Sequence, residues 1–355
     1  MIGICTPSLV DVEAAAERIT GLVRPLTVVE AGPEYAPGAE VFLGLEFMQH
    51  TGSFKARGAA NLLAAMLAAG TVPDAGIVSA TGRNADIGFA WAARMFGIPA
   101  TVFLADSAAK ARVDRLRALG ADVRVFGRTQ EQAQDNAGLF MARTGAIDAY
   151  TFDDNLTSAG AGTILLECLT AIPKLDTIVL AVGAGGMFSG VAAVAEGRGI
   201  RVVGAEPEGS CALHAALAAD AVLDVDIDSI AADSLGAPRI SAAALSWARS
   251  ADARSVVVDD DAIIRARRSL WEGYGLVVEH GSATALAALS TRAYRPGRGE
   301  RVGVILCGAN TDPTDLRAEI GAVGHHPGRT ETGCTHRQEF SSASTVKSRA
   351  SASAR

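Results

Sequence analysis

Lys55 is the residue whose position first points to covalent chemistry. The 355-residue chain has 32 basic residues, of which only four are lysines: Lys55, Lys110, Lys174 and Lys347. Lys55 follows Ser53 and Phe54 and precedes an alanine- and leucine-rich stretch, which predicts a helix to Leu67 capped by Thr51 or Ser53. A helix N-terminus disfavours a cation, and desolvation favours the neutral amine that attacks a carbonyl carbon. An ordinary exposed helix lysine is the alternative.

A glycine-rich turn indicates a phosphate site. The apolar run 177–182 leads directly into Gly183, Ala184, Gly185 and Gly186, and a helix is expected from about Met187. Small residues let backbone N–H groups converge on a phosphate, and a helix N-terminus adds a favourable field. A purely structural tight turn is the alternative.

A nicotinamide-dependent dehydrogenase is the rival interpretation of this turn. Phe188 occupies the third glycine position of the dinucleotide fingerprint, so the match is partial. Glu206 nevertheless ends the next strand, where a ribose-binding acid would lie. No Gly-Lys-Ser/Thr follows, which excludes a P-loop.

Three other segments place polar groups at expected strand ends. Thr81-Gly82-Arg83-Asn84 follows the strand predicted at 76–80 and could bind an anion, although Asn84 could instead cap a helix. Cys307 ends the strand predicted at 302–307, where a thiol is commonly just a small hydrophobe. Glu279 ends an apolar run before Ser282, for which helix capping is the simple alternative.

The elements that must position these residues alternate along the chain. Short runs rich in Val, Ile and Leu, expected to be strands covered on both faces, alternate with alanine-rich helical stretches over about residues 40–320. They fall into two series, separated by a helix predicted at 157–172: 76–80, 100–104 and 122–126, then 177–182, 200–205, 255–258 and 302–307. This pattern predicts an α/β fold with parallel sheets in two units.

Composition excludes several classes of protein. A net charge of −7 without basic clusters argues against nucleic-acid binding, and the apolar runs are too short to span a membrane. The N-terminus lacks the basic start of a secretory signal. Five scattered cysteines without CxxC spacing favour reduced thiols in a cytoplasmic protein. Residues 324–355, rich in Ser, Thr and Arg, predict a disordered tail.

Five ordered blocks resemble the fold-type II pyridoxal-phosphate (PLP) enzymes, specifically the serine/threonine dehydratases. The most specific block is Gln49-His50-Thr51-Gly52-Ser53-Phe54-Lys55-Ala56-Arg57-Gly58. The glycine-rich turn 183–187 and the segment Gly204-Ala205-Glu206-Pro207 come next, followed by Val278-Glu279-His280-Gly281-Ser282-Ala283 and Cys307-Gly308-Ala309-Asn310. The resemblance covers about residues 20–320.

This resemblance implies a tryptophan-synthase-β-like fold of two open, twisted α/β domains with the site in their cleft. The large, PLP-binding domain would comprise residues 1–58 and 149–323, and the small domain residues 59–148. Lys55 would attach PLP as a Schiff base and act as the base at the substrate Cα, while Phe54 would pack on the ring. Asn84 would bind the ring hydroxyl, Cys307 would face the pyridine nitrogen, and Gly183, Ala184, Gly185, Gly186 and Met187 would hold the phosphate.

The implied reaction is β-elimination (dehydration and deamination) of a 3-hydroxy amino acid, L-threonine or L-serine, to give a 2-oxo acid plus ammonia. Substrate would contact Ser53, Thr81, Gly82 and Arg83, and the protein would be a homodimer. A thiol at position 307 makes the ring a weaker electron sink, which suits prompt elimination.

Two departures from the family pattern affect the choice of substrate. Gly82 replaces the serine that acts as second base in serine racemases, which counts against racemisation. Arg83 replaces a glycine; it either points away or pairs with an acidic substrate, as in a hydroxyaspartate ammonia-lyase.

A third departure concerns metal binding. Ala212 replaces the acidic partner of a possible metal ligand at Glu206, so we predict no metal.

Overall fold

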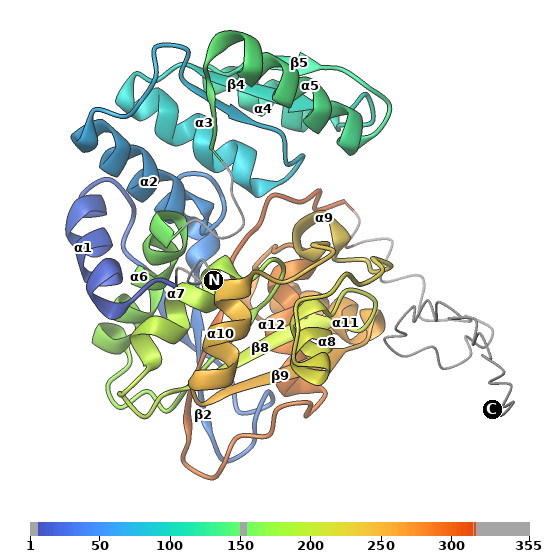
Figure 1. Cartoon of the computed structure of the whole chain (residues 1–355). Coiled ribbons are helices and arrows are strands. Elements are labelled where there is room, and N and C mark those ends of the chain that lie inside the picture. Colours follow the sequence, from blue (N-terminus) through green and yellow to red (C-terminus); the bar gives the residue numbers. More distant parts are fainter. Residues whose placement is uncertain (1–5, 150–154, 315, 317–355) are drawn as a thin grey trace, which may run out of the picture.

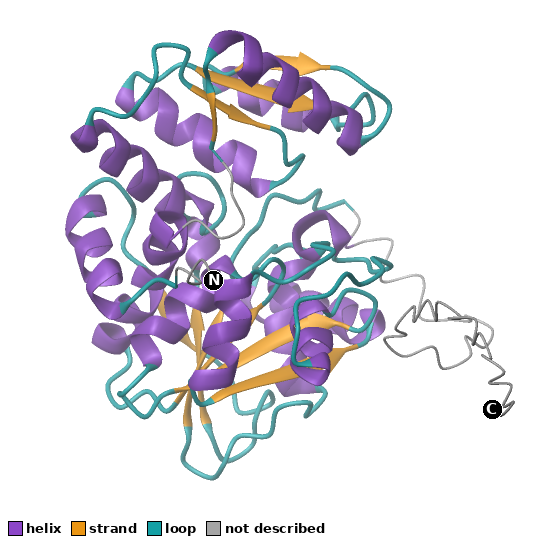
Figure 2. Ribbon diagram, viewed as in Figure 1, coloured by secondary structure: helices purple, strands orange, loops and turns teal. Residues whose placement is uncertain are grey.

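A computed structural model describes residues 6–149, 155–314 and 316 (Figure 1). The described strands form two separate sheets, which lie apart in Figure 2. The six-stranded sheet has the order β1-β2-β10-β7-β8-β9 and the four-stranded sheet the order β5-β4-β3-β6. All pairings are parallel except that of β1 with β2.

The predicted strands were all confirmed to within about two residues at each end. The larger sheet contains β1 (Val28–Glu30), β2 (Glu40–Gly44), β7 (Thr177–Ala181), β8 (Arg201–Pro207), β9 (Ala253–Val258) and β10 (Arg301–Ile305). The smaller contains β3 (Ile77–Ser79), β4 (Ala100–Leu104), β5 (Asp122–Val125) and β6 (Ile147–Asp148). The sequence pattern did not identify β1, β2 or β6, of which β1 and β6 are too short for a hydrophobic period to be measured.

Helices cover both sheets and occupy the connections between parallel strands. In chain order they are α1 (Leu9–Ile19), the 3₁₀ helix η1 (Glu46–Met48), α2 (Lys55–Ala69), α3 (Asn84–Phe96), α4 (Lys110–Ala118), α5 (Gln130–Thr144) and α6 (Asn155–Ala171), followed by α7 (Gly186–Ala195), α8 (Ala212–Ala219), α9 (Ala232–Leu235), α10 (Ala242–Ser250), α11 (Asp260–Tyr274) and α12 (His280–Ser290). The helix predicted at 157–172 corresponds to α6.

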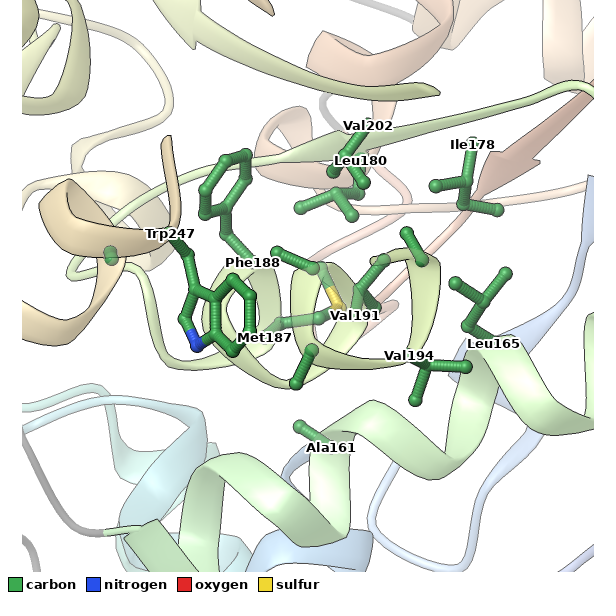
Figure 3. Close-up of a cluster of buried hydrophobic side chains, with 14 of the residues drawn as sticks. Ala161, Leu165, Ile178, Leu180, Met187, Phe188, Val191, Val194, Val202 and Trp247 are labelled. Carbon is green, nitrogen blue, oxygen red and sulfur yellow. The ribbon is translucent and has the colours of Figure 1, made fainter. Parts of the chain in front are cut away.

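The larger sheet is buried on both faces, as its continuous apolar strands predict. One face packs against α1, α6, α7 and α10, and Phe188 and Trp247 belong to the same buried cluster as Leu180 and Val202 (Figure 3). The other packs against α11 and α12, with Leu270 and Leu286 among the buried side chains. This core fixes the carboxyl ends of β7 and β10, from which the glycine-rich turn and Cys307 follow.

A buried ion pair holds the start of α2. Arg57 is fully buried and donates from Nε to Glu46 Oε1 at 2.7 Å and from Nη2 to Glu46 Oε2 at 3.0 Å. The same guanidinium binds Glu167 of α6. Because the bonds converge from η1 and α6, they fix the orientation of the turn that carries Lys55.

The two sheets are linked through α2, which packs on both α3 and α6. The predicted domain boundaries, 58/59 and 148/149, fall in the first turn of α2 and at the end of β6, and they stay a prediction. The predicted tail at 324–355 lies outside the described residues. No helix in the described ranges is long and apolar enough to cross a membrane.

Cys168 and Cys307 are free thiols, but Cys211 is disulfide-bonded, so the expectation of reduced thiols was wrong there.

Candidate functional site

A cavity of about 720 Å³ lies between the two sheets and brings together most of the predicted site residues. The ends of β3, β6, β7 and β10 contribute walls, as expected where parallel strands point their carboxyl ends at a cleft. The predicted residues that line it are Phe54, Lys55, Thr81, Arg83, Asn84, Gly183, Ala184, Gly185, Gly186, Met187 and Cys307.

Lys55 is the first residue of α2, as predicted, and its side chain lines the cavity. Its Nζ lies 4.7 Å from the centroid of the Phe54 ring. The predicted cap was wrong: Phe54 is the N-cap residue and makes no side-chain cap. Thr51 Oγ1 instead donates to the Ser53 carbonyl at 3.0 Å, and the Phe54 N–H donates to the Cys307 carbonyl at 2.9 Å. The chain before Lys55 is therefore fixed against the turn after β10.

Ser53 is fully buried and does not belong to the cavity lining. It forms an antiparallel bridge with Gly308, and its Oγ has no hydrogen-bond partner among the described residues. Its predicted contact with substrate therefore stays a prediction, one that requires the hydroxyl to become accessible.

The glycine-rich turn has the properties of an anion cradle. Gly185 has φ +94° and is the N-cap of α7, so the first helical amides open toward the cavity. Within the described ranges, the amides from Gly183 to Phe188 have no hydrogen-bond acceptor. A side chain at Gly185 would meet the Ala244 methyl at 2.4 Å. Unsatisfied amides at a helix start fit a phosphate group.

Asn84 is held between Glu279, the N-cap residue of α12, and Asn310, which follows β10. Its Nδ2 donates to both oxygens of Glu279 at 2.9 Å, and its Oδ1 accepts from Asn310 Nδ2 at 2.7 Å. Asn84 is the first residue of α3 and Arg83 its N-cap, so the capping alternative was wrong. Burial raises the pKa of Glu279 to about 7. The contacts fix which end of the Asn84 amide carries the donor.

Cys307 and Ser282 support each other beneath the cavity. Ser282 Oγ lies 3.5 Å from Cys307 Sγ and donates to the Gly308 carbonyl at 2.7 Å. The Gly308 amide in turn donates to Ser282 Oγ at 2.6 Å, so this hydroxyl braces the turn rather than capping α12. Burial raises the pKa of Cys307 to about 12, which keeps the thiol neutral at ordinary pH.

The loop 81–84 forms the wall that belongs to the smaller sheet. Asp86 shapes it by accepting from the Thr81 amide at 3.0 Å and from Thr81 Oγ1 at 2.8 Å. Gly82 has φ +66°, and a side chain there would meet Gln130 Oε1 at 2.6 Å. Arg83 does not point away from the cleft. Its Nη2 donates across it to the Gly236 carbonyl at 2.6 Å.

Sequence reasoning missed several residues that complete the site. Gln130, Gln134, Ala137 and Met141 of α5 line the cavity, and the helix predicted after strand 122–126 was the available signal. Arg115 of α4 donates to Asn310 Oδ1 and to the Thr51 carbonyl, joining the two halves of the chain. No local pattern marks Arg115, because its partners are distant in sequence.

Glu206 has a structural role instead of the ribose contact of the rival dinucleotide interpretation. Its carboxylate accepts from the Leu213 amide at 2.7 Å and from the His214 amide at 2.8 Å, at the start of α8. It does not line the cavity. Among the described residues, no group of three or more His, Cys, Asp or Glu side chains could hold a metal ion.

The fold and site together define an α/β enzyme that holds a phosphorylated cofactor beside a lysine amine. A family model described as pyridoxal-phosphate dependent enzyme matches residues 19–308. Phenylserine dehydratase from Ralstonia pickettii is 33% identical over 90% of this chain and 99% of its own length. L-threonine ammonia-lyase from Thermotoga maritima is 29% identical over 86% of this chain and 76% of its own length. The structure of maize serine racemase has a TM-score of 0.82 and 26% identity, covering 89% of this chain and 98% of that one.

The chain belongs to the family of pyridoxal-phosphate dependent enzymes. The resemblance to the fold-type II serine/threonine dehydratases, with their fold class and their cofactor, is confirmed. The protein is an enzyme of the PLP-dependent lyase type.

Proposed function

We propose that this enzyme eliminates water from a 3-hydroxy amino acid, L-threonine or L-serine, and that hydrolysis of the product takes up one water again, so that a 2-oxo acid and ammonia are released. The observation that carries the proposal is the position of Lys55 at one wall of the cavity, with the unsatisfied amides 183–188 at another. A cofactor held by its phosphate at those amides would present its aldehyde to the lysine.

The residues present fit PLP. Gly183, Ala184, Gly185, Gly186 and Met187 would hold the phosphate, with Phe54 beside the ring, Asn84 at its hydroxyl and neutral Cys307 at its nitrogen. PLP, when bound, supplies the electron withdrawal that acidifies the substrate Cα.

The chain itself supplies proton transfer and positioning. Lys55 Nζ would accept the Cα proton, and the 3-hydroxyl would leave as water after protonation. The resulting enamine hydrolyses to the 2-oxo acid and ammonia. Thr81, Gly82 and Arg83 would hold the substrate, and Ser53 would join them if its buried hydroxyl became accessible.

The spectrum of the purified protein tests the cofactor assignment. The wild-type protein is expected to show a visible absorption band that borohydride bleaches, and Lys55→Ala should abolish it because no amine remains to bind the aldehyde. Lys110→Ala, at an exposed surface ion pair, is the matched control and should keep the band. A colourless wild-type protein that takes up no PLP would overturn the proposal.

Direct assay of 2-oxo acid release tests the reaction. A panel of L-serine, L-threonine, 3-phenylserine and 3-hydroxyaspartate covers a hydrogen, a methyl, a phenyl and a carboxylate at carbon 3. The phenyl member is included because the Ralstonia pickettii relative is a phenylserine dehydratase. Absence of 2-oxo acid from every member would contradict a dehydratase.

Amino-acid racemisation is the second candidate, favoured by the likeness to serine racemases. It requires a second proton donor on the face opposite Lys55. Position 82 offers none, because it is a glycine whose φ of +66° also disfavours a side chain. With L-serine as substrate, we expect release of 2-oxo acid to exceed formation of D-serine measured in the same reaction mixture.

We further propose a cytoplasmic homodimer. The free thiols of Cys168 and Cys307 support the location, and the dimer rests on the resemblance to the dehydratases alone. Light scattering after size exclusion should give twice the chain mass of 36.4 kDa.

A further inference from the structure

The cavity continues well beyond the proposed cofactor site, along one face of α5. Gln130, Gln134, Ala137 and Met141 line it at successive spacings of four, three and four residues, which place them on one side of a helix. The eleven residue-to-residue steps from Gln130 to Met141 extend about 16 Å at 1.5 Å per residue. The cavity wall formed by α5 is therefore far longer than a methyl group requires.

The two ends of this wall differ in chemistry. At the first end, Gln130 Nε2 donates to the Ala80 carbonyl at 2.6 Å, which fixes α5 beside the loop 81–84. Farther along, Ala137 and Met141 face the cavity together with Val78 and belong to an apolar cluster with Phe103 and Phe140. Asp148, which pairs with Val78 in the sheet, adds one carboxyl group to the cavity lining. The polar end suits the head of an amino acid, and the apolar end suits an apolar side chain.

Ala137 sets the free space at the apolar end. It is 3% exposed and lies in the middle of the lining face. Its methyl leaves room that a larger residue would fill. Met141 is unbranched and adaptable, and thioethers make favourable contacts with aromatic rings.

We propose that the α5 face formed by Gln130, Gln134, Ala137 and Met141 is the subsite for the 3-substituent of the substrate, and that it takes an aromatic ring. This inference rests on the proposed function and names its substrate class: 3-hydroxy amino acids with an aryl group at carbon 3. L-Serine and L-threonine place only hydrogen or methyl there and leave the apolar end unused. A buried aromatic ring contributes far more apolar contact than a methyl group.

Binding of unreactive analogues tests the subsite without turnover. L-Phenylalanine and L-2-aminobutyrate lack the 3-hydroxyl and carry a phenyl and a methyl, respectively. Their dissociation constants can be measured from the change in the visible spectrum of the holoenzyme. Ala137→Leu is expected to weaken L-phenylalanine by at least about tenfold relative to L-2-aminobutyrate, since single methylene-sized changes in such pockets cost about 10–200-fold. The ratio of kcat/KM for 3-phenylserine to that for L-threonine should fall in parallel.

Leu139→Ala is the matched control, because Leu139 lies on the outer face of the same helix and is 62% exposed. It should leave both ratios unchanged. Ala137→Val gives a smaller step should the leucine variant fail to fold.

Two results would overturn the subsite. Equal weakening of both analogues by Ala137→Leu would make the α5 face a route into the site, and unchanged dissociation constants for both analogues would remove it from binding. If either result is obtained while L-threonine still yields a 2-oxo acid, the proposed function stands and only the subsite is refuted. Failure of the wild type on every 3-hydroxy amino acid refutes the proposed function itself.

Discussion

At the scale of single residues, the site depends on side chains whose surroundings restrict what they can do. Cys307 is kept neutral by burial, and the Asn84 amide is oriented by Glu279 and Asn310. Neither property belongs to the residue type alone. A buried neutral thiol and a fixed amide direction both follow from desolvation and from partners that are distant in sequence.

Arg83 yields a prediction at this scale. It lines the cavity and carries a cation where the family pattern has glycine, so it should improve the use of a substrate with a second carboxylate relative to a glycine variant, without making that substrate the preferred one. Arg83→Gly is expected to lower kcat/KM for 3-hydroxyaspartate relative to L-threonine by about tenfold, the equivalent of one charged hydrogen bond of roughly 1.5 kcal/mol. Assays of 2-oxo acid release measure the ratio. An unchanged ratio would show that the Arg83 cation serves only the contact with Gly236.

At the scale of elements, close helix packing supports the phosphate cradle. Helices α6 and α7 approach at glycines: a Cβ on Gly190 would lie 2.0 Å from the Ser158 carbonyl oxygen and 2.7 Å from the Gly162 nitrogen. The obstacles are backbone atoms, which cannot rotate aside. The start of α7, and with it the cradle, therefore has its position set by residues without side chains.

Gly190→Ala tests this packing. The added methyl should destabilise the protein by about 1–3 kcal/mol, the usual cost of overpacking a core, and should weaken PLP binding by displacing α7. Gly138→Ala on α5 is the matched control, because a Cβ there meets nothing within 4 Å. It should stabilise by about 0.5–1 kcal/mol, since alanine is the better helix former. Denaturant unfolding of both variants provides the measurement, and a neutral Gly190→Ala would contradict close packing.

At the scale of the whole molecule, polar bonds between distant parts of the chain close the cleft. Arg115 reaches from α4 to the Thr51 carbonyl at 2.9 Å, and Asn310 bonds Asn84 from the turn after β10. These contacts join the two halves at the site, so ligand binding and relative movement of the sheets are expected to be coupled.

Buried carboxyl groups predict how stability depends on pH. Burial raises the pKa of Glu206 to about 8 and that of Glu279 to about 7, from an ordinary value of 4.5. Between pH 4.5 and these raised pKa values, the folded protein holds more protons than the unfolded chain. The free energy of unfolding should therefore fall as pH rises through this window. We expect a lower Tm at pH 8.5 than at pH 6.

Glu206→Gln should flatten this dependence, because an amide does not titrate. The exposed Glu272→Gln is the control and should leave the slope as in the wild type. Thermal unfolding followed by circular dichroism provides the measurement. A Tm that rises between pH 6 and pH 8.5 would contradict the claim that burial disfavours the ionised form of these two carboxyl groups.

The sequence by itself was sufficient for most of the fold and for the reaction type. Strands β3, β4, β7, β8 and β10 follow from continuous apolar runs, because burial on both faces leaves a local signal. The edge strands β5 and β9 are only partly buried and follow from short runs rich in valine. The block around Lys55 and the glycine-rich turn 183–187 predicted the cofactor, since both motifs are contiguous.

Only the tertiary structure decided where groups from separate segments meet. It showed that Glu206 accepts hydrogen bonds from the start of α8 and that Arg83 donates to the Gly236 carbonyl. It also showed that one face of α5 lines the cavity. It also replaced the predicted caps at Ser53 and Asn84 with other contacts. Local patterns record the preference of a segment for helix or strand. Hydrogen-bond partners and cavity walls depend on segments that are far apart in the sequence, such as Asn84 and Glu279, which are 195 residues apart.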